Sequence, residues 1–120
     1  MPLSFDATLS LRTRQGGRII AVSDLRVIAA RDNYSEVILA DGSQMLLRKT
    51  LKSWQEALPA SHFARVHRTK IVNVASIERY EREEADRTRL YLTGLAKPIE
   101  ASRRTWGQLR ARLTALHTVV

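Results

Sequence analysis

The sequence predicts a mostly-β domain of short antiparallel strands, with one short helix near the middle of the chain and another near its C-terminus. Two observations support this fold class. Apolar and polar residues alternate with a period of two along most of the chain, which is typical of strands that bury one face. Residues that favour tight turns separate these stretches, and only two segments change to the helical period. A chain of 120 residues is long enough for one domain with its own core.

The first half of the chain contains five predicted strands, each bounded by turn-forming residues: 8–14, 18–22, 25–30, 34–40 and 44–48. Gly16-Gly17 is expected to turn the first strand into the second as a β-hairpin. Asp32-Asn33 marks a later turn, and Asp41-Gly42 is expected to form the turn of another hairpin. These short connections predict that neighbouring strands run antiparallel.

The second half of the chain continues this pattern, with an extended stretch at 63–68 and strands at 70–74, 76–83 and 87–93. A tight loop is expected near Ala85-Asp86. Gly94 is expected to end the last of these strands, ahead of a short stretch around Pro98-Ile99.

The first helix is predicted over residues 50–59, where the apolar period changes. Leu51, Trp54 and Leu58 occupy positions i, i+3 and i+7, which lie on one face of a helix. Thr50 is expected to cap its start and Pro59 to end it.

The second helix is predicted near the C-terminus, where Thr105 and Gln108 have the spacing of a capping box. One face of this helix is apolar and consists of Trp106, Leu109, Leu113 and Leu116. Arg110 and Arg112 are expected to point elsewhere. The tryptophans and leucines of both helices are expected to pack in the core.

The charge distribution gives the first indication of function. The net charge is +8, which favours a polyanionic partner such as a nucleic acid, an anionic membrane surface or an acidic protein. Five of the twelve acidic residues lie in the window 78–89, whereas 63–73 and 97–112 contain a single one, Glu100. This separation predicts a basic face on the folded domain.

The sequence does not contain the residue spacings that catalysis or metal binding would require. There is no cysteine, and His62, His67 and His117 lack carboxylates at a spacing suited to a metal site. No G-x-S-x-G elbow and no glycine-rich phosphate loop occurs. We therefore expect neither enzymatic activity nor a cofactor. The apolar runs are too short to span a bilayer, and the N-terminus does not resemble a signal peptide, so a cytoplasmic protein is expected.

The stretch FARVHRTKIVN at 63–73 combines cationic and apolar residues in a way that strict alternation does not separate. A turn or irregularity at residues 67–69 would let His67, Arg68 and Lys70 leave the core while the apolar residues stay in it. Turns carried by rigid strands are common places for binding residues. An arginine can chelate guanine or grip phosphate, and a lysine supplies a point charge for phosphate. Arg65 fits either a phosphate contact or a cross-sheet ion pair.

The longer run FARVHRTKIVNVASI at 63–77 is similar to the signature F-x-R-x-H-R-S-x-I-V-N-x-x-x-I of the LytTR DNA-binding domain, which occurs in many bacterial response regulators. Thr69 replaces the usual serine. The resemblance continues in LRVIAARDNYSEVILADG at 25–42 and in ASRRTWGQL at 101–109. It implies a stack of small antiparallel sheets and a single LytTR-like domain over residues 1–120, with a core at about 9–113.

The resemblance also implies how the chain functions, as a bacterial transcription regulator that binds double-stranded DNA through loops inserted into successive major grooves. The residues at matching positions are Asn33, Tyr34, Ser35, His67, Arg68, Lys70, Ser102, Arg103 and Arg104. Arg68 is expected to read a base, and Lys70 and Arg103 to contact phosphates. Promoters with repeated sites and a homodimer on DNA are expected, because one small domain contacts only a short site.

Several of these residues fit two roles. His67 could contact DNA or fix the loop by hydrogen bonding, and Tyr34 could lie at DNA or in the core. Arg104 could contact a base or the backbone. Asn73 is expected to bond local backbone groups rather than nucleic acid. Glu100, beside the basic segment, is expected to point away from it or to pair with an arginine.

Two other partners are compatible with the charge. A basic RNA-binding protein is one, although the aromatic content of 6% gives few stacking platforms for single-stranded RNA. A protein-interaction module that binds an acidic partner is the other.

Overall fold

The computed structural model describes residues 2–83 and 87–118. Within them the chain forms ten strands, in order β1 (Thr8–Thr13), β2 (Gly16–Ala21), β3 (Leu25–Arg31), β4 (Tyr34–Leu39), β5 (Gln44–Leu47), β6 (Phe63–His67), β7 (Lys70–Asn73), β8 (Ile77–Arg82), β9 (Arg87–Leu92) and β10 (Ile99–Ser102). The helices are α1 (Leu51–Ala57) and α2 (Arg103–Leu116), and single 3-10 turns lie at Val22–Asp24 and Val74–Ser76. The loop predicted near Ala85-Asp86 lies outside the described residues.

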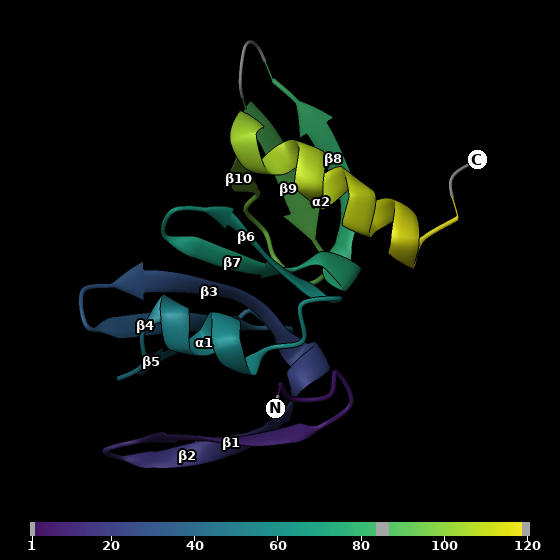
Figure 1. Ribbon diagram of the computed structural model, residues 1–120. Helices are drawn as coiled ribbons and strands as arrows, with labels where there is room; N and C mark the ends of the chain where they lie inside the picture. Colours follow the sequence, from purple (N-terminus) through teal and green to yellow (C-terminus); the bar gives the residue numbers. More distant parts are fainter. Residues whose placement is uncertain (1, 84–86, 119–120) are drawn as a thin grey trace.

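The strands form three antiparallel sheets stacked on one another (Figure 1). The β1–β2 hairpin is the lowest layer in that view, the five-stranded sheet β5-β4-β3-β7-β6 is the middle layer, and β10-β9-β8 is the upper layer. Helix α1 packs beside the middle sheet and α2 covers the upper one. The predicted mostly-β fold with stacked small sheets and two helices is confirmed.

The middle sheet is buried on both faces because it separates two hydrophobic cores. Neighbouring residues of one strand point to opposite faces of a sheet. Accordingly, Ile28 and Ile71 belong to the core shared with the hairpin and α1, whereas Val27 and Val72 belong to the core shared with the upper sheet and α2. This double burial explains why apolar residues are adjacent rather than alternating in both strands, as Val27-Ile28 in β3 and Ile71-Val72 in β7.

The first hairpin forms as predicted, but its turn is displaced. Thr13 pairs with Gly16, so Arg14 and Gln15 make the turn, and Gly16-Gly17 opens β2. A Cβ atom on Gly17 would lie 2.5 Å from the backbone oxygen of Leu11. The second glycine is therefore required for the close approach of two strands. This requirement, rather than the turn itself, explains the glycine.

The turn between β4 and β5 lies at Asp41-Gly42 as predicted. The Asp41 carboxylate accepts hydrogen bonds from the Ser43 backbone N–H (2.9 Å) and the Ser43 hydroxyl (2.5 Å). Arg18 of β2 also reaches this carboxylate, at 3.4 Å. The hydrogen bonds from Ser43, with a smaller contribution from Arg18, hold the pKa of Asp41 below its ordinary value.

Helix α1 begins as predicted, since the Thr50 hydroxyl accepts a hydrogen bond from the Ser53 backbone N–H. The predicted start of α2 is wrong, because the helix already begins at Arg103. The Thr105 hydroxyl, which was expected to cap it, donates instead to the backbone oxygen of Val66 at 2.8 Å. Arg112, which was expected to lie off the apolar face of α2, reaches the backbone oxygen of Phe63 with its guanidinium at 2.5 Å.

Candidate nucleic-acid interface

The residues implicated by the sequence fall into a first segment (33–35), a second segment (67–70) and a third segment (102–104). The first two lie side by side because β3 and β7 are neighbours in the middle sheet. Ala30, at the end of β3, donates a backbone hydrogen bond to Thr69 in the turn between β6 and β7 (2.8 Å). The turn between β3 and β4 and the turn between β6 and β7 therefore project from the same end of the sheet, at the left in Figure 1.

The third segment joins the other two through the first turn of α2. The hydrogen bond from the Thr105 hydroxyl to Val66 ties this turn to the end of β6. The Ser102 hydroxyl lies 3.1 Å from the Thr105 hydroxyl and is half-buried, which fixes the chain where the helix begins. The third segment thus lies next to the second. We use the term loop edge for the side of the molecule on which all three segments come together.

A β-bulge separates the cationic side chains of the second segment from the apolar ones. Arg65 pairs with Ile71 and His67 pairs with Lys70, so Val66 is the additional residue. Val66 is fully buried, whereas Arg65 and His67 are exposed. The predicted irregularity is therefore confirmed. It explains how a strand rich in arginine and histidine still contributes to a core.

The His67 ring holds this turn in shape. Its Nδ1 accepts a hydrogen bond from the Thr69 backbone N–H (3.2 Å) and lies 3.0 Å from the Thr69 hydroxyl. When Nδ1 accepts, the proton of a neutral imidazole is on Nε2, so the outward nitrogen is a donor. The loop-fixing role is therefore present, and it leaves Nε2 with the chemistry needed for a contact to an acceptor. Thr69 retains the hydroxyl of the serine it replaces.

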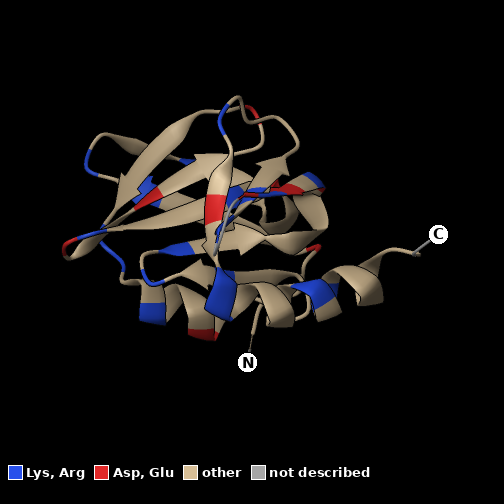
Figure 2. Cartoon of the chain, turned by 90° about the horizontal axis from the view of Figure 1, so that it is seen from above, with Lys and Arg blue, Asp and Glu red and all other residues tan. Residues whose placement is uncertain are grey.

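Three cationic side chains of the loop edge, Arg68, Lys70 and Arg104, take part in no ion pair with a carboxylate among the described residues. In the upper sheet, by contrast, arginines and acids alternate and pair, as Arg79–Glu81, Arg89–Glu83 and Arg87–Glu100. The expected pairing of Glu100 with an arginine is confirmed, at 3.9 Å. Figure 2 shows how basic residues outnumber acidic ones over the molecule.

The first segment contributes less than the sequence predicted. Tyr34 is 42% exposed and Asn33 is exposed, so neither is a core residue. Ser35 is fully buried, and its hydroxyl accepts a hydrogen bond from the Trp54 indole N–H at 2.8 Å. The prediction that the Ser35 side chain contacts DNA is therefore wrong, because this side chain belongs to the core beneath α1.

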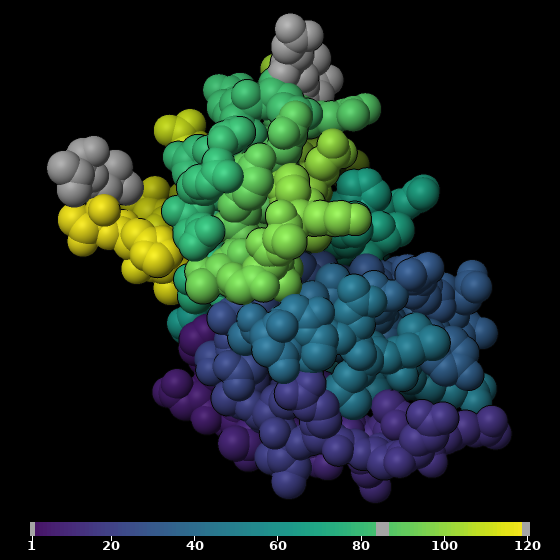
Figure 3. Space-filling model, turned by 180° about the vertical axis from the view of Figure 1, so that it is seen from behind, coloured from purple at the N-terminus to yellow at the C-terminus, as the bar shows by residue number. Residues whose placement is uncertain are grey.

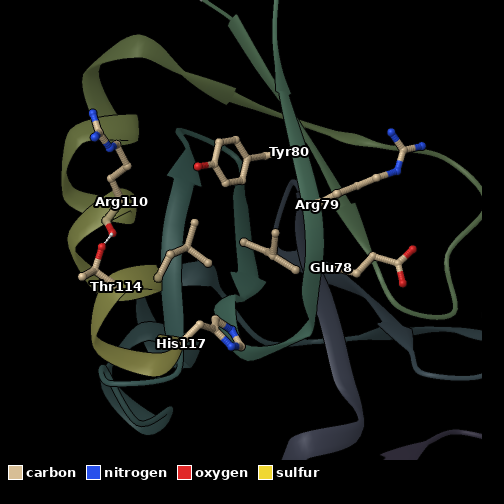
Figure 4. A pocket seen from close by; sticks show the side chains of 8 residues that line it. Glu78, Arg79, Tyr80, Arg110, Thr114 and His117 are labelled. Carbon is tan, nitrogen blue, oxygen red and sulfur yellow. Dashed lines mark hydrogen bonds between the residues drawn. The ribbon is translucent and has the colours of Figure 1, made fainter. Parts of the chain in front are cut away.

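A hollow of about 630 Å³ between β8 and the second half of α2 lies apart from the loop edge (Figure 4). Tyr80 points toward α2 and contacts the Trp106 ring, with centroids 4.6 Å apart, while Arg79 points away and covers the Tyr91 ring. Over residues 2–83 and 87–118, no group of three His, Asp or Glu side chains is placed to hold a metal ion. The hollow is at the opposite end of α2 from Arg104.

Comparison with known proteins shows to which family the chain belongs. The sequence model of the LytTr DNA-binding domain family matches residues 16–114. The chain belongs to this family. A solved LytTr DNA-binding domain, from a protein of Bacillus cereus described as a methyl-accepting/DNA response regulator, has the same fold, with a TM-score of 0.76 over 88% of this chain and 95% of that one at 22% identity.

A longer relative is an uncharacterized response regulatory protein of Vibrio cholerae serotype O1. It is 29% identical over 84 residues, which are 68% of this chain. The LytTR chain spans about a third (32%) of the length of that relative. Membership in the LytTR family implies DNA binding and transcription regulation, and it agrees with the expectation of a protein that is not an enzyme. In the part of the chain that the structure describes, neither helix is long and apolar enough to cross a membrane.

Two positioning groups of the LytTR loop edge were not recognised from the sequence. Arg65 makes no ion pair among the described residues. It donates to the backbone oxygen of Arg68 (2.5 Å) and lies 3.4 Å from the Gln55 amide oxygen. Thr105 reaches Val66, which is 39 positions away. The Arg65 contact depends on how the turn between β6 and β7 folds, and the Thr105 contact depends on how distant segments pack.

Arg65→Ala is expected to weaken DNA binding about fivefold, because the second segment loses the hydrogen bond that holds Arg68. Equilibrium binding to a DNA site at several salt concentrations measures the effect, and the salt dependence should not change. Gln55→Ala, which removes only the longer contact, is the control and should bind like the wild type. A fall in the salt slope by about one would instead identify Arg65 as a phosphate contact.

Proposed function

We propose that this LytTR domain binds specific sites in double-stranded DNA and regulates bacterial transcription by placing the three segments of the loop edge in successive major grooves. The observation that carries the proposal is the convergence of these segments, since it puts cationic side chains from distant parts of the sequence on one side of the fold. A duplex presents phosphates and base edges along one face in the same way.

Each cationic side chain has a proposed role. Arg68, in the turn between β6 and β7, reads a base through its planar guanidinium. Lys70 and Arg103 contact phosphates. Arg104, exposed in the first turn of α2, reaches a base or the backbone beside them. The His67 Nε2 and the first segment, through Asn33 and Tyr34, complete the contacts.

A pair of domains on a repeated site follows from the size of the interface. One domain of this size buries on the order of 1,000 Å² against DNA and covers a short sequence. Two copies, in contact or joined through bent DNA, would give the affinity that a regulator needs. The number of copies on a selected site, measured by sedimentation of the complex, tests this part of the proposal.

A competition experiment tests the function itself. Duplex sites are first selected from genomic fragments, and a labelled site is then challenged with nonspecific duplex or with RNA of the same sequence in rising salt. We expect only the specific duplex to compete well. Equal competition by RNA would support an RNA-binding protein. Absence of binding to both nucleic acids would support a protein-interaction module.

Lys70→Ala is expected to reduce affinity for all duplexes alike and to lower the slope of log Kobs against log salt by about 0.9, the value for one phosphate contact. Binding isotherms on the selected site and on a nonspecific duplex measure both quantities. Lys70→Arg should keep the slope, because it keeps the charge. A change confined to the selected site would show that Lys70 reads bases.

A further inference from the structure

A cationic groove lies beside the loop edge, and Tyr34 is the one residue of its described lining that the sequence predicted to bind DNA. The groove separates the β1–β2 hairpin from the corner where β5 meets α1. One hollow of about 480 Å³ in this groove is lined by Arg12, Thr13, Arg14, Gln15, Tyr34, Leu46 and Arg48. A second, of about 440 Å³, is lined in part by Arg12, Arg48 and Lys49. We call the two together the hairpin groove.

The charge of the hairpin groove is uncompensated. No aspartate or glutamate lines either hollow. Arg12, Arg14 and Arg48 are exposed and take part in no ion pair among the described residues. Arg18, on the other strand of the same hairpin, differs, since it contacts Asp41 and donates to the Ser43 hydroxyl at 2.6 Å. Arg12, Arg14 and Arg48 thus differ from Arg18 in having no acidic partner among the described residues.

The hairpin groove continues the row of segments that forms the loop edge. The strand order β6-β7-β3-β4-β5 places the turn between β6 and β7 next to the turn between β3 and β4, and β1 contacts β5 beyond them. Tyr34 belongs both to the first segment and to the wall of the groove. Seen from behind, the three turns follow one another along the right-hand edge, teal, blue and then purple (Figure 3).

We propose that the hairpin groove holds the phosphate backbone of the same duplex, so that the β1–β2 hairpin is a further DNA-contacting element at one end of the site. This inference rests on the proposed function. Five strands about 4.8 Å apart span roughly 19 Å within the sheet, and the hairpin layer packs about 10 Å from the face of that sheet. Both lengths fit within the 43 Å length of the domain, so the hairpin groove and the loop edge are close enough to contact neighbouring parts of one duplex.

The side chains of the groove suit phosphate rather than bases. Arginine forks bind phosphate oxygens with two parallel hydrogen bonds, and such contacts position a protein without reading sequence. The Lys49 ammonium is already engaged, since it donates to the Ser53 hydroxyl (2.8 Å) and lies 5.2 Å from the centre of the Trp54 ring. Three phosphate contacts, from Arg12, Arg14 and Arg48, are therefore expected.

The test compares the wild type with the triple variant Arg12→Ala/Arg14→Ala/Arg48→Ala on a selected duplex site. The salt slope is expected to fall by about 2.7, for three contacts of about 0.9 each. Backbone protection should be lost at one end of the footprint, while discrimination between the site and its single-base variants stays the same. The corresponding triple lysine variant should keep the slope. Arg18→Ala is the matched control and should bind like the wild type.

The outcomes separate this inference from the proposed function. Suppose that the wild type binds specifically and that the triple variant keeps both the salt slope and the full footprint. This outcome would overturn the inference about the hairpin groove and leave the proposed function intact. A wild type that binds no duplex overturns both proposals. Loss of discrimination without loss of slope would also overturn the inference, because it would mean that the groove reads bases. Thermal unfolding verifies that the variants fold, which their exposed positions favour.

Discussion

Arg68→Ala is expected to remove about 1–3 kcal/mol of discrimination between the target site and variants of it that differ at one base pair. The reason is geometric. Arg68 is exposed at the tip of a turn whose backbone is held by Arg65 and whose flanking histidine is tied to Thr69. A guanidinium presented from such a support reaches a base edge with little loss of freedom on binding.

The measurement is a set of equilibrium binding curves on the selected site and on its single-base variants at one salt concentration. Affinity for nonspecific duplex should change much less than affinity for the site. Arg68→Lys separates charge from shape, because lysine keeps the charge but lacks the planar fork, so it should bind duplexes but discriminate poorly. Arg79→Ala, which removes an exposed arginine from the upper sheet, is the control. Equal loss on every sequence would reduce Arg68 to a phosphate contact.

Asn73→Ala is expected to destabilise the fold by about 2–4 kcal/mol, the cost of leaving two buried acceptors without a donor. The Asn73 amide is fully buried at the end of β7. It donates to the backbone oxygens of Ser23 (3.1 Å) and Leu25 (2.9 Å), and so joins the middle sheet to the chain entering β3. The prediction that Asn73 bonds backbone groups is confirmed, but the expectation that these groups are local is wrong, because both are distant in sequence. Thermal denaturation should show a Tm lower by roughly 10 °C.

Asn73→Asp should be more damaging near neutral pH than Asn73→Ala. The new carboxylate would face two carbonyl oxygens without a donor, and burial raises the pKa of such a group. Stability should therefore recover in part as the pH falls and the carboxyl gains a proton to donate. Asn33→Ala, at an exposed turn, is the matched control and should shift stability by no more than about 0.5 kcal/mol. An unchanged Tm for Asn73→Ala would contradict the structural role.

The strands and the fold class follow from local patterns, and the exceptions have identifiable causes. Gly16-Gly17 was interpreted as a turn, but the second glycine is needed where it approaches Leu11. The start of α2 was placed at Thr105 because its spacing to Gln108 suits a cap, whereas that hydroxyl serves β6. In both cases a residue that favours a local motif is used for a tertiary contact.

Only part of the candidate site could be predicted from the sequence. Charge and the resemblance to the LytTR signature identified the second and third segments. The failure of strict alternation predicted a turn or irregularity at residues 67–69, which the structure forms as a bulge at Val66 followed by a turn. The burial of Ser35 could have been predicted from the sequence. Its side chain faces the same side of β4 as those of Val37 and Leu39, and both of these are buried. The convergence of the three segments had no such signal, since it depends on the pairing of β3 with β7 and on one hydroxyl reaching across the fold.

The sharing of β7 between two cores restricts how this protein can change over evolutionary time. Ile71 and Val72 face opposite layers, so inserting or deleting one residue within the strand would exchange their places and misfill both interiors at once. The tips that project beyond the sheet carry no such constraint. Substitutions at these tips can therefore change what the protein recognises, while the length of β7 stays fixed.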